Sequence, residues 1–135
     1  MSDWLAEESD APAVLMVDDN LVMVKQVIQV LSPHGLNCHW ARSSDEAKRI
    51  LKLNRVDLVI ADIRLPSMNG IELARWLRVQ TGYQDLPVLF FTAASDRPTI
   101  EAATRIANVD YLLRPLRPAQ FCERVLKHIR PQNQR

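Results

Sequence analysis

Polar or charged residues follow four short apolar runs, and their types could support phosphoryl transfer. Asp18 and Asp19 follow AVLMV, Asp62 follows LVIA, Thr92 follows PVLFF and Arg114 follows DYLL. Three carboxylates in one cleft repel each other unless a cation lies among them. Oxygen ligands favour a hard divalent ion, and partly hydrated Mg²⁺ is the best candidate.

A hydroxyl and a guanidinium beside such carboxylates indicate an anion bound next to the metal. Phosphoryl transfer needs a metal together with cationic or hydrogen-bonding groups that neutralise charge on the phosphoryl oxygens. Aspartyl phosphate is an established covalent intermediate, and Asp62 stands alone after the central apolar run. We therefore predict Asp62 as the nucleophile, although one carboxylate after a strand is by itself more often a helix cap.

The elements that must position these residues alternate between strands and helices. Runs that are apolar on both faces are typical of parallel strands covered by helices, and five are predicted, at 13–17, 37–41, 58–61, 87–91 and 110–113. Ser43 and Glu46 form a capping-box pattern that opens the second helix. Pro98 and Pro118 suit the first turns of the fourth and fifth helices. The sequence predicts an α/β fold, a doubly wound five-stranded parallel sheet flanked by five helices, with function at the carboxyl ends of the strands.

Length and composition fit one small domain and exclude several classes. The 135 residues carry 17 Lys and Arg against 16 Asp and Glu, a net charge of +1, unlike a basic nucleic-acid-binding domain. No apolar run approaches the ~20 residues of a membrane helix, and the acidic start is unlike a signal peptide. We expect a cytoplasmic protein without direct membrane or nucleic-acid contacts. Cys38 and Cys122 read as buried thiols, and Trp40 and Trp76 as packing residues.

Four motifs in this order resemble the response-regulator receiver domain of two-component signalling: VDDN (17–20), DIRLPSMNG (62–70), FTA (91–93) and DYLLRP (110–115). The likeness runs from Ala13 to Ile129. The intervals of 43 residues from Asp19 to Asp62, 30 to Thr92 and 22 to Arg114 are typical of that family. The resemblance implies a flavodoxin-like sheet with strand order 2-1-3-4-5. The expected organisation is an acidic flexible tail at 1–12, a receiver domain at 13–130, and a polar tail or truncated linker at 131–135.

The resemblance also assigns an acceptor and a metal site. Asp62 would take a phosphoryl group from a phosphohistidine of a sensor histidine kinase or phosphotransfer protein. Asp18, Asp19 and Asp62 would hold Mg²⁺, with the backbone carbonyl of Arg64 as a further ligand. The kinase, the pathway and the output are open, and the chain could be a free regulator or an excised receiver.

A switch is implied by the same resemblance. Thr92, with Ala93 beside it, would bind the phosphoryl oxygens, and Thr92 would shift inward on activation. Tyr111 would rotate from an exposed to a buried position. The surface of the fourth helix, fifth strand and fifth helix would contact an output domain or protein, or a second copy in a homodimer.

One residue departs from the family pattern, because Arg114 stands where a lysine is usual. The bond between Arg114 and Pro115 is expected to be cis, as in the family, with the guanidinium near Asp62 or a bound anion. Arginine is a broad planar fork, so it could contact phosphoryl oxygens, crowd the site, or pair with Asp62 at rest. Side chains at the positions of Arg64 and Ala94 flank the attacking water in the family.

The competing hypothesis is a pseudo-receiver, a phosphorylation-independent protein-binding module of the same fold. The carboxylates and Thr92 favour the switch, and Arg114 alone favours the pseudo-receiver. A flavin-binding flavodoxin is disfavoured because Asp18 and Asp19 would repel a phosphate in the first loop. A haloacid-type phosphatase is disfavoured because it needs a second aspartate where Arg64 stands.

Overall fold

The computed structural model describes the backbone of residues 11–133 and the side chains of residues 11–129. All but the last two residues of the expected acidic tail, 1–12, lie outside the described residues. The elements are β1 (Ala13–Val17), α2 (Leu21–Leu31), a 3₁₀ turn η1 (Ser32–His34), β2 (Asn37–Ala41), α3 (Ser44–Leu53), β3 (Leu58–Ala61), α4 (Gly70–Arg78), β4 (Val88–Thr92), α5 (Arg97–Thr104), β5 (Val109–Leu113) and α6 (Pro118–Asn133). None of the helices in these residues is both long and apolar enough to cross a bilayer.

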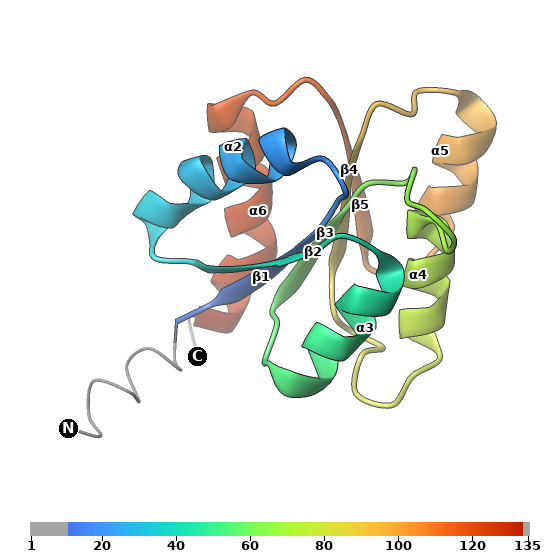
Figure 1. Ribbon diagram of the computed structural model, residues 1–135, viewed down its shortest axis with the longest axis horizontal. Helices are drawn as coiled ribbons and strands as arrows, with labels where there is room; N and C mark the ends of the chain where they lie inside the picture. The colour runs from blue at the N-terminus through green and yellow to red at the C-terminus, as the bar shows by residue number, and fades with distance from the viewer. Residues whose placement is uncertain (1–10, 134–135) are drawn as a thin grey trace.

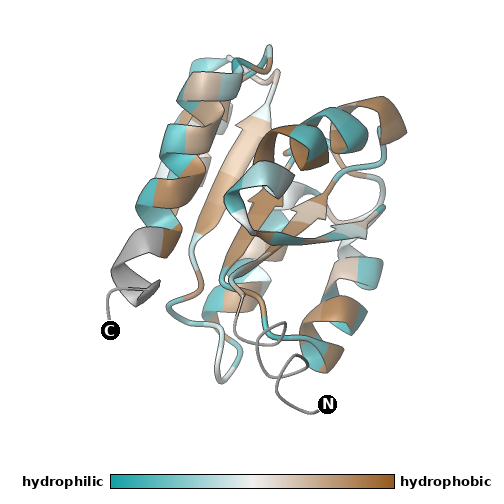
Figure 2. Ribbon diagram, turned by 90° about the vertical axis from the view of Figure 1, so that its left-hand side faces the viewer, coloured by the Kyte–Doolittle hydropathy of each residue, from teal (hydrophilic) through white to brown (hydrophobic). Residues whose placement is uncertain are grey.

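The five strands form one parallel sheet in the order β2-β1-β3-β4-β5, which confirms the predicted fold class. Helices α2 and α6 cover one face, and α3, α4 and α5 cover the other (Figure 1). The strand ribbons are largely hydrophobic in Figure 2, whereas the helices mix both kinds of residue. Sheet residues buried on two sides produce this pattern, because alternate side chains enter opposite cores.

Each face of the sheet has its own core. The core under α3, α4 and α5 includes Leu15, Val59, Phe90, Leu73 and Leu77. The core under α2 and α6 includes Met16, Ile60, Phe91, Phe121 and Ile129. Neighbouring strand residues such as Leu15 and Met16 therefore point to opposite cores, and the sheet is fixed between two apolar layers.

Element ends differ from the predictions at a few positions. Strand β4 is shifted by one residue and ends at Thr92, because Pro87 has no N–H to donate to the sheet, whereas Thr92 O accepts from Arg114 N at 2.9 Å. Strand β5 begins one residue early, at Val109. Helix α5 begins at Arg97 with Pro98 in its first turn, as predicted, and the Asp96 side chain caps it by accepting from Thr99 N. Helix α6 begins at Pro118 but continues to Asn133, so the expected tail at 131–133 is helical.

The capping pattern of the second predicted helix is only half formed. The Ser43 hydroxyl accepts from Glu46 N at 3.2 Å, but Glu46 Oε1 accepts from Arg42 N instead of Ser43 N. A complete capping box occurs at α4, where Asn69 and Glu72 accept each other's backbone N–H. Asparagine replaces the more familiar serine or threonine of the motif there.

An ion cluster joins β5 to α6. Asp110 accepts from Arg124 Nη1 at 2.9 Å and from Tyr111 N at 2.8 Å, and its second oxygen lies 2.9 Å from His128 Nε2. Burial by itself would raise the pKa of Asp110. The bonds from His128 and the Tyr111 N–H, together with the charge of Arg124, outweigh burial and lower this pKa to about 2.

The depressed pKa of Asp110 predicts acid-sensitive stability. Its folded pKa of about 2 lies below the ordinary value of 3.8, so the unfolded chain binds more protons between these values. The stabilisation is therefore complete above about pH 4 and lost as the pH falls through about 2. Asp110→Asn should lower the free energy of unfolding at neutral pH, and its deficit should shrink in acid. Glu101→Gln, at an exposed pair with Arg97, is the control. A deficit that stayed constant with pH would contradict the prediction.

Candidate functional site

The register of the sheet brings the acidic residues to one edge. Val17 at the end of β1 pairs with Ala61 at the end of β3, so Asp18 and Asp62 follow neighbouring strands at the same level. Their backbones continue the sheet bonding, since Asp62 N donates to Val17 O at 3.1 Å and Asp18 N donates to Ala41 O at 3.0 Å. Asp18 is fully buried and Asp19 is exposed. Strand pairing therefore fixes the backbone positions of Asp18 and Asp62.

Two contacts outside the sheet hold Asp18 in place. Its Oδ1 accepts from Asn20 N at 2.8 Å, and Asn20 also caps α2 by accepting from Met23 N. The Trp40 indole N–H donates to the Asp18 backbone carbonyl at 2.7 Å. Sequence reasoning missed this contact and assigned Trp40 to packing. A tryptophan just before the end of the strand next to β1 was the available signal.

The Arg114 guanidinium lies between the buried carboxylate of Asp18 and the partly exposed carboxylate of Asp62. Its Nη2 forms an ion pair with Asp18 Oδ2 and lies 3.7 Å from Asp62 Oδ2. The Arg114–Pro115 bond is cis, and the guanidinium carbon lies 5.1 Å above the Phe91 ring. The expected proximity to Asp62 is present, but the closer partner is Asp18, which the sequence did not predict. The Arg114 Nε is buried and has no hydrogen-bond partner within the described part of the chain.

The loop after β3 presents Asp62 at the protein surface. The Asp62 side chain is 14% exposed, and its Oδ1 accepts from Arg64 N at 3.3 Å. Arg64 itself is exposed. The loop then turns back closely, so Gly70 N donates to Ile63 O at 2.8 Å. A Cβ atom at Gly70 would lie 2.3 Å from the Asp62 carbonyl oxygen, so only glycine fits this approach.

Thr92 and Tyr111 meet through one residue of the loop after β4. The buried Thr92 hydroxyl accepts from Ala94 N at 3.2 Å, and the Tyr111 hydroxyl donates to Ala94 O at 2.7 Å. The half-buried Tyr111 ring lies 6.1 Å from the Phe90 ring. Burial raises the pKa of Tyr111, and the negative charges of Asp96 and Asp62 raise it further. Ala93 is exposed at the same edge.

The donor types at this edge fit Mg²⁺, because aspartate and backbone carbonyl oxygens are its usual protein ligands. Among the residues that the structure describes, however, no three His, Cys, Asp or Glu side chains are gathered as a ready metal site. The positive charge beside Asp18 and Asp62 is the guanidinium of Arg114. The edge therefore combines an acidic pair, a cation and a hydroxyl.

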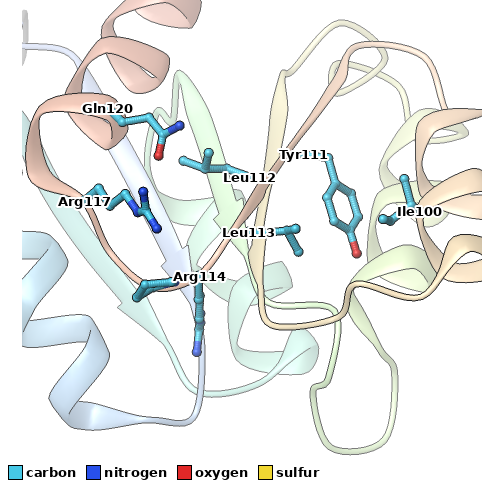
Figure 3. Close-up of a pocket in the computed structure, with 8 residues that line it drawn as sticks. Ile100, Tyr111, Leu112, Leu113, Arg114, Arg117 and Gln120 are labelled. Carbon is cyan, nitrogen blue, oxygen red and sulfur yellow. The ribbon is translucent and has the colours of Figure 1, made fainter.

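A surface groove of about 520 Å³ lies beside this edge, between α5 and α6 across the end of β5. Its lining residues are Ile100, Tyr111, Leu112, Leu113, Arg114, Pro115, Arg117 and Gln120. In Figure 3 the Arg114 side chain extends away from Arg117 and Gln120. Tyr111 and Arg114 thus belong both to the groove and to the edge of the sheet that carries Asp18 and Asp62, which we call the acidic edge. The groove joins this edge to the surface of α5, β5 and α6, which are the predicted fourth helix, fifth strand and fifth helix.

Comparisons with known proteins agree with this geometry. A family model described as the response regulator receiver domain matches residues 14–126. The chain is 32% identical over 111 residues to the cyclic di-GMP phosphodiesterase response regulator RpfG of Xanthomonas campestris, covering 80% of this chain and 29% of RpfG. It is 30% identical over 119 residues to the transcriptional regulatory protein YvrH of Bacillus subtilis, covering 87% of this chain and 49% of YvrH.

A solved structure is also similar. The signal receiver domain of an HD domain-containing protein from Pseudomonas fluorescens superposes with a TM-score of 0.84 at 26% identity, covering 93% of this chain and 99% of that domain. The chain spans about half or less of the two curated relatives just named, and nearly all of the isolated domain.

Proposed function

Because this chain belongs to the response regulator receiver domain family, we propose that it is a phosphorylation-dependent signalling switch of the cytoplasm, with Asp62 as the phospho-acceptor. The donor is the phosphohistidine of a sensor histidine kinase or phosphotransfer protein. The chain is a switch and not a classical enzyme, although it assists its own phosphorylation and dephosphorylation.

One observation carries the proposal: a partly exposed carboxylate, Asp62, directly follows the central strand β3 and lies beside the Arg114 guanidinium. Arg114 Nη2 lies 3.7 Å from Asp62 Oδ2, and the buried Thr92 hydroxyl ends the neighbouring strand. In the proposed step, an Asp62 oxygen bonds to phosphorus while the bond from phosphorus to the histidine nitrogen breaks. The electron pair of that bond remains on the imidazole nitrogen.

The residues proposed to hold Mg²⁺ are Asp18, Asp19, Asp62 and the backbone carbonyl of Arg64. A bound Mg²⁺ would neutralise charge on the phosphoryl oxygens. Arg114 contributes a guanidinium that can donate to these oxygens, and Thr92 a hydroxyl. Arg64 and Ala94 stand at the two positions whose side chains flank the attacking water in the family pattern.

We propose that the signal leaves through the Thr92–Ala94–Tyr111 connection. A Thr92 hydroxyl that turns to a phosphoryl oxygen gives up its bond from Ala94 N, and Ala94 O is the acceptor of Tyr111. Movement of this loop therefore changes the support of Tyr111 in the groove. The partner on α5, β5 and α6 is an output domain or protein, or a second copy of this chain, and not a nucleic acid.

The proposal predicts self-phosphorylation from a small phosphodonor. With Mg²⁺ present, intact-mass measurement should detect one acid-labile phosphoryl group per chain. Omission of Mg²⁺ or its removal by a chelator should suppress the mass increase, because the phosphoryl charge is then poorly neutralised. A chain that gained no phosphoryl group from small donors or from a phosphorylated kinase would be a pseudo-receiver. The pairing of Arg114 with Asp18 is the observation that favours this second function.

A further inference from the structure

We propose that Arg114 is a resident cation of the acidic site, which Mg²⁺ must displace from Asp18, so that this exchange sets the metal affinity of the chain. The inference deepens the proposed function and rests on its metal site. It concerns a feature of this sequence, the arginine that stands where a lysine is usual.

The first observation is the oxygen that Arg114 occupies. Asp18 Oδ1 already accepts from Asn20 N at 2.8 Å, and Oδ2 is the partner of Arg114 Nη2. The Asp18 side chain is only 1% exposed and that of Arg114 15% exposed, so water screens the pair weakly. Two cations repel each other at one carboxylate oxygen, so a metal ion that binds Asp18 Oδ2 competes with the guanidinium.

The second observation is how the side chain reaches Asp18. Arg114 crosses the Phe91 ring, with the guanidinium carbon 5.1 Å from the ring centre, and extends away from Arg117 and Gln120 (Figure 3). Its Nε is buried without a hydrogen-bond partner among the described residues. A buried unpaired N–H costs free energy, which the ion pair offsets here. Movement of the guanidinium out of the site would expose Nε to water and remove this cost, which favours the exchange.

Removal of one partner of a buried ion pair leaves the other charge uncompensated, and an uncompensated buried carboxylate attracts a metal ion more strongly. Replacement of Arg114 by a neutral residue should therefore tighten Mg²⁺ binding. A lysine should have a smaller effect in the same direction, because its ammonium is a point charge that lacks the planar fork of arginine.

The test is a Mg²⁺ titration of the full chain without phosphodonor, at constant ionic strength because salt screens charges. Calorimetry measures the dissociation constant, and tryptophan fluorescence reports on the loop, since the Trp40 indole bonds to the Asp18 carbonyl. Arg114→Gln should bind Mg²⁺ about tenfold more tightly than the parent. Arg97→Gln is the matched control, because it removes the same charge from a side chain that is 87% exposed at the start of α5; its dissociation constant should equal that of the parent. Arg114→Lys should lie between the parent and Arg114→Gln, and it serves if the glutamine variant does not fold.

Asp19→Asn tests whether Mg²⁺ binds at the proposed metal site. It also distinguishes failure of the exchange from failure of the proposed function. Loss of binding in Asp19→Asn, together with selective tightening in the Arg114 variants, supports the exchange. If Arg97→Gln tightened Mg²⁺ binding as much as Arg114→Gln, the change in net charge would explain the effect, and the inference would be overturned. Unchanged affinity in the Arg114 variants, with binding still lost in Asp19→Asn, would overturn the inference but leave the metal site of the proposed function intact. Absence of binding in the parent and in every variant would overturn both.

Discussion

Asp62→Asn is expected to abolish phosphoryl incorporation completely while the chain remains folded. An amide has the shape of the carboxylate but is a far weaker nucleophile, so the covalent step fails. Its Oδ1 can still accept from Arg64 N, a bond of 3.3 Å in the parent. The measurement is intact mass after incubation with a small phosphodonor and Mg²⁺, with circular dichroism as the check on folding.

Asp96→Asn is the matched control for this loss. Asp96 is an exposed carboxylate at the same edge of the sheet, and it caps α5 by accepting from Thr99 N at 3.1 Å. Asparagine caps a helix as well as aspartate, so the fold should be unaffected and incorporation should equal that of the parent. A phosphoryl group that persisted in Asp62→Asn would assign the nucleophile to another residue and refute the proposed acceptor.

The second large effect is expected for Gly70→Ala, because a Cβ at Gly70 would lie 2.3 Å from the Asp62 carbonyl oxygen and 3.0 Å from Ile63 Cα. Both atoms belong to the backbone, so neither a rotamer change nor a flexible side chain can relieve the overlap. We expect the free energy of unfolding to fall by about 3 kcal/mol, the upper part of the usual range for overpacking. The phosphorylation rate should fall about tenfold or more, because displacement of the loop moves Asp62 relative to Arg114.

Gly35→Ala separates the effect of the clash from the general cost of replacing a glycine. Gly35 has a φ of 76°, and nothing lies within 4 Å of the position of its Cβ. The left-handed conformation should cost this variant roughly 1 kcal/mol, with no change in phosphorylation rate. Urea unfolding supplies the stabilities and intact mass supplies the rates. Parent-like stability and rate in Gly70→Ala would show that the loop adapts freely.

Arg114 connects the proposed switch and the proposed metal exchange. Its guanidinium pairs with Asp18 and lies 3.7 Å from Asp62, and the same residue is part of the lining of the groove beside Tyr111. A cation that leaves Asp18 for a phosphoryl oxygen would change its contacts at the acidic edge and at the groove in one movement. Arg114→Lys and Arg114→Gln therefore test metal affinity and output through a single side chain.

The sequence by itself determined the order of the elements and the position of the chemistry. Strands β1 and β3 were predicted with their observed ends because a strand covered by helices on both sides must be apolar at every position, a local signal. The parallel sheet then requires that residues after the strands, such as Asp18 and Asp62, meet at one edge. The family motifs added the assignment of roles to these residues.

The tertiary structure alone decided which partners these residues take. Arg114 and Asp18 lie 96 residues apart, and the choice of Asp18 over Asp62 depends on the path of one long side chain over Phe91. The bond from Trp40 to the Asp18 carbonyl and the contact of Gly70 with the Asp62 carbonyl likewise depend on how loops pack after folding. Sequence patterns record burial and local conformation, whereas the choice between two neighbouring acceptors depends on distances of an ångström or two that arise only when the strands are assembled.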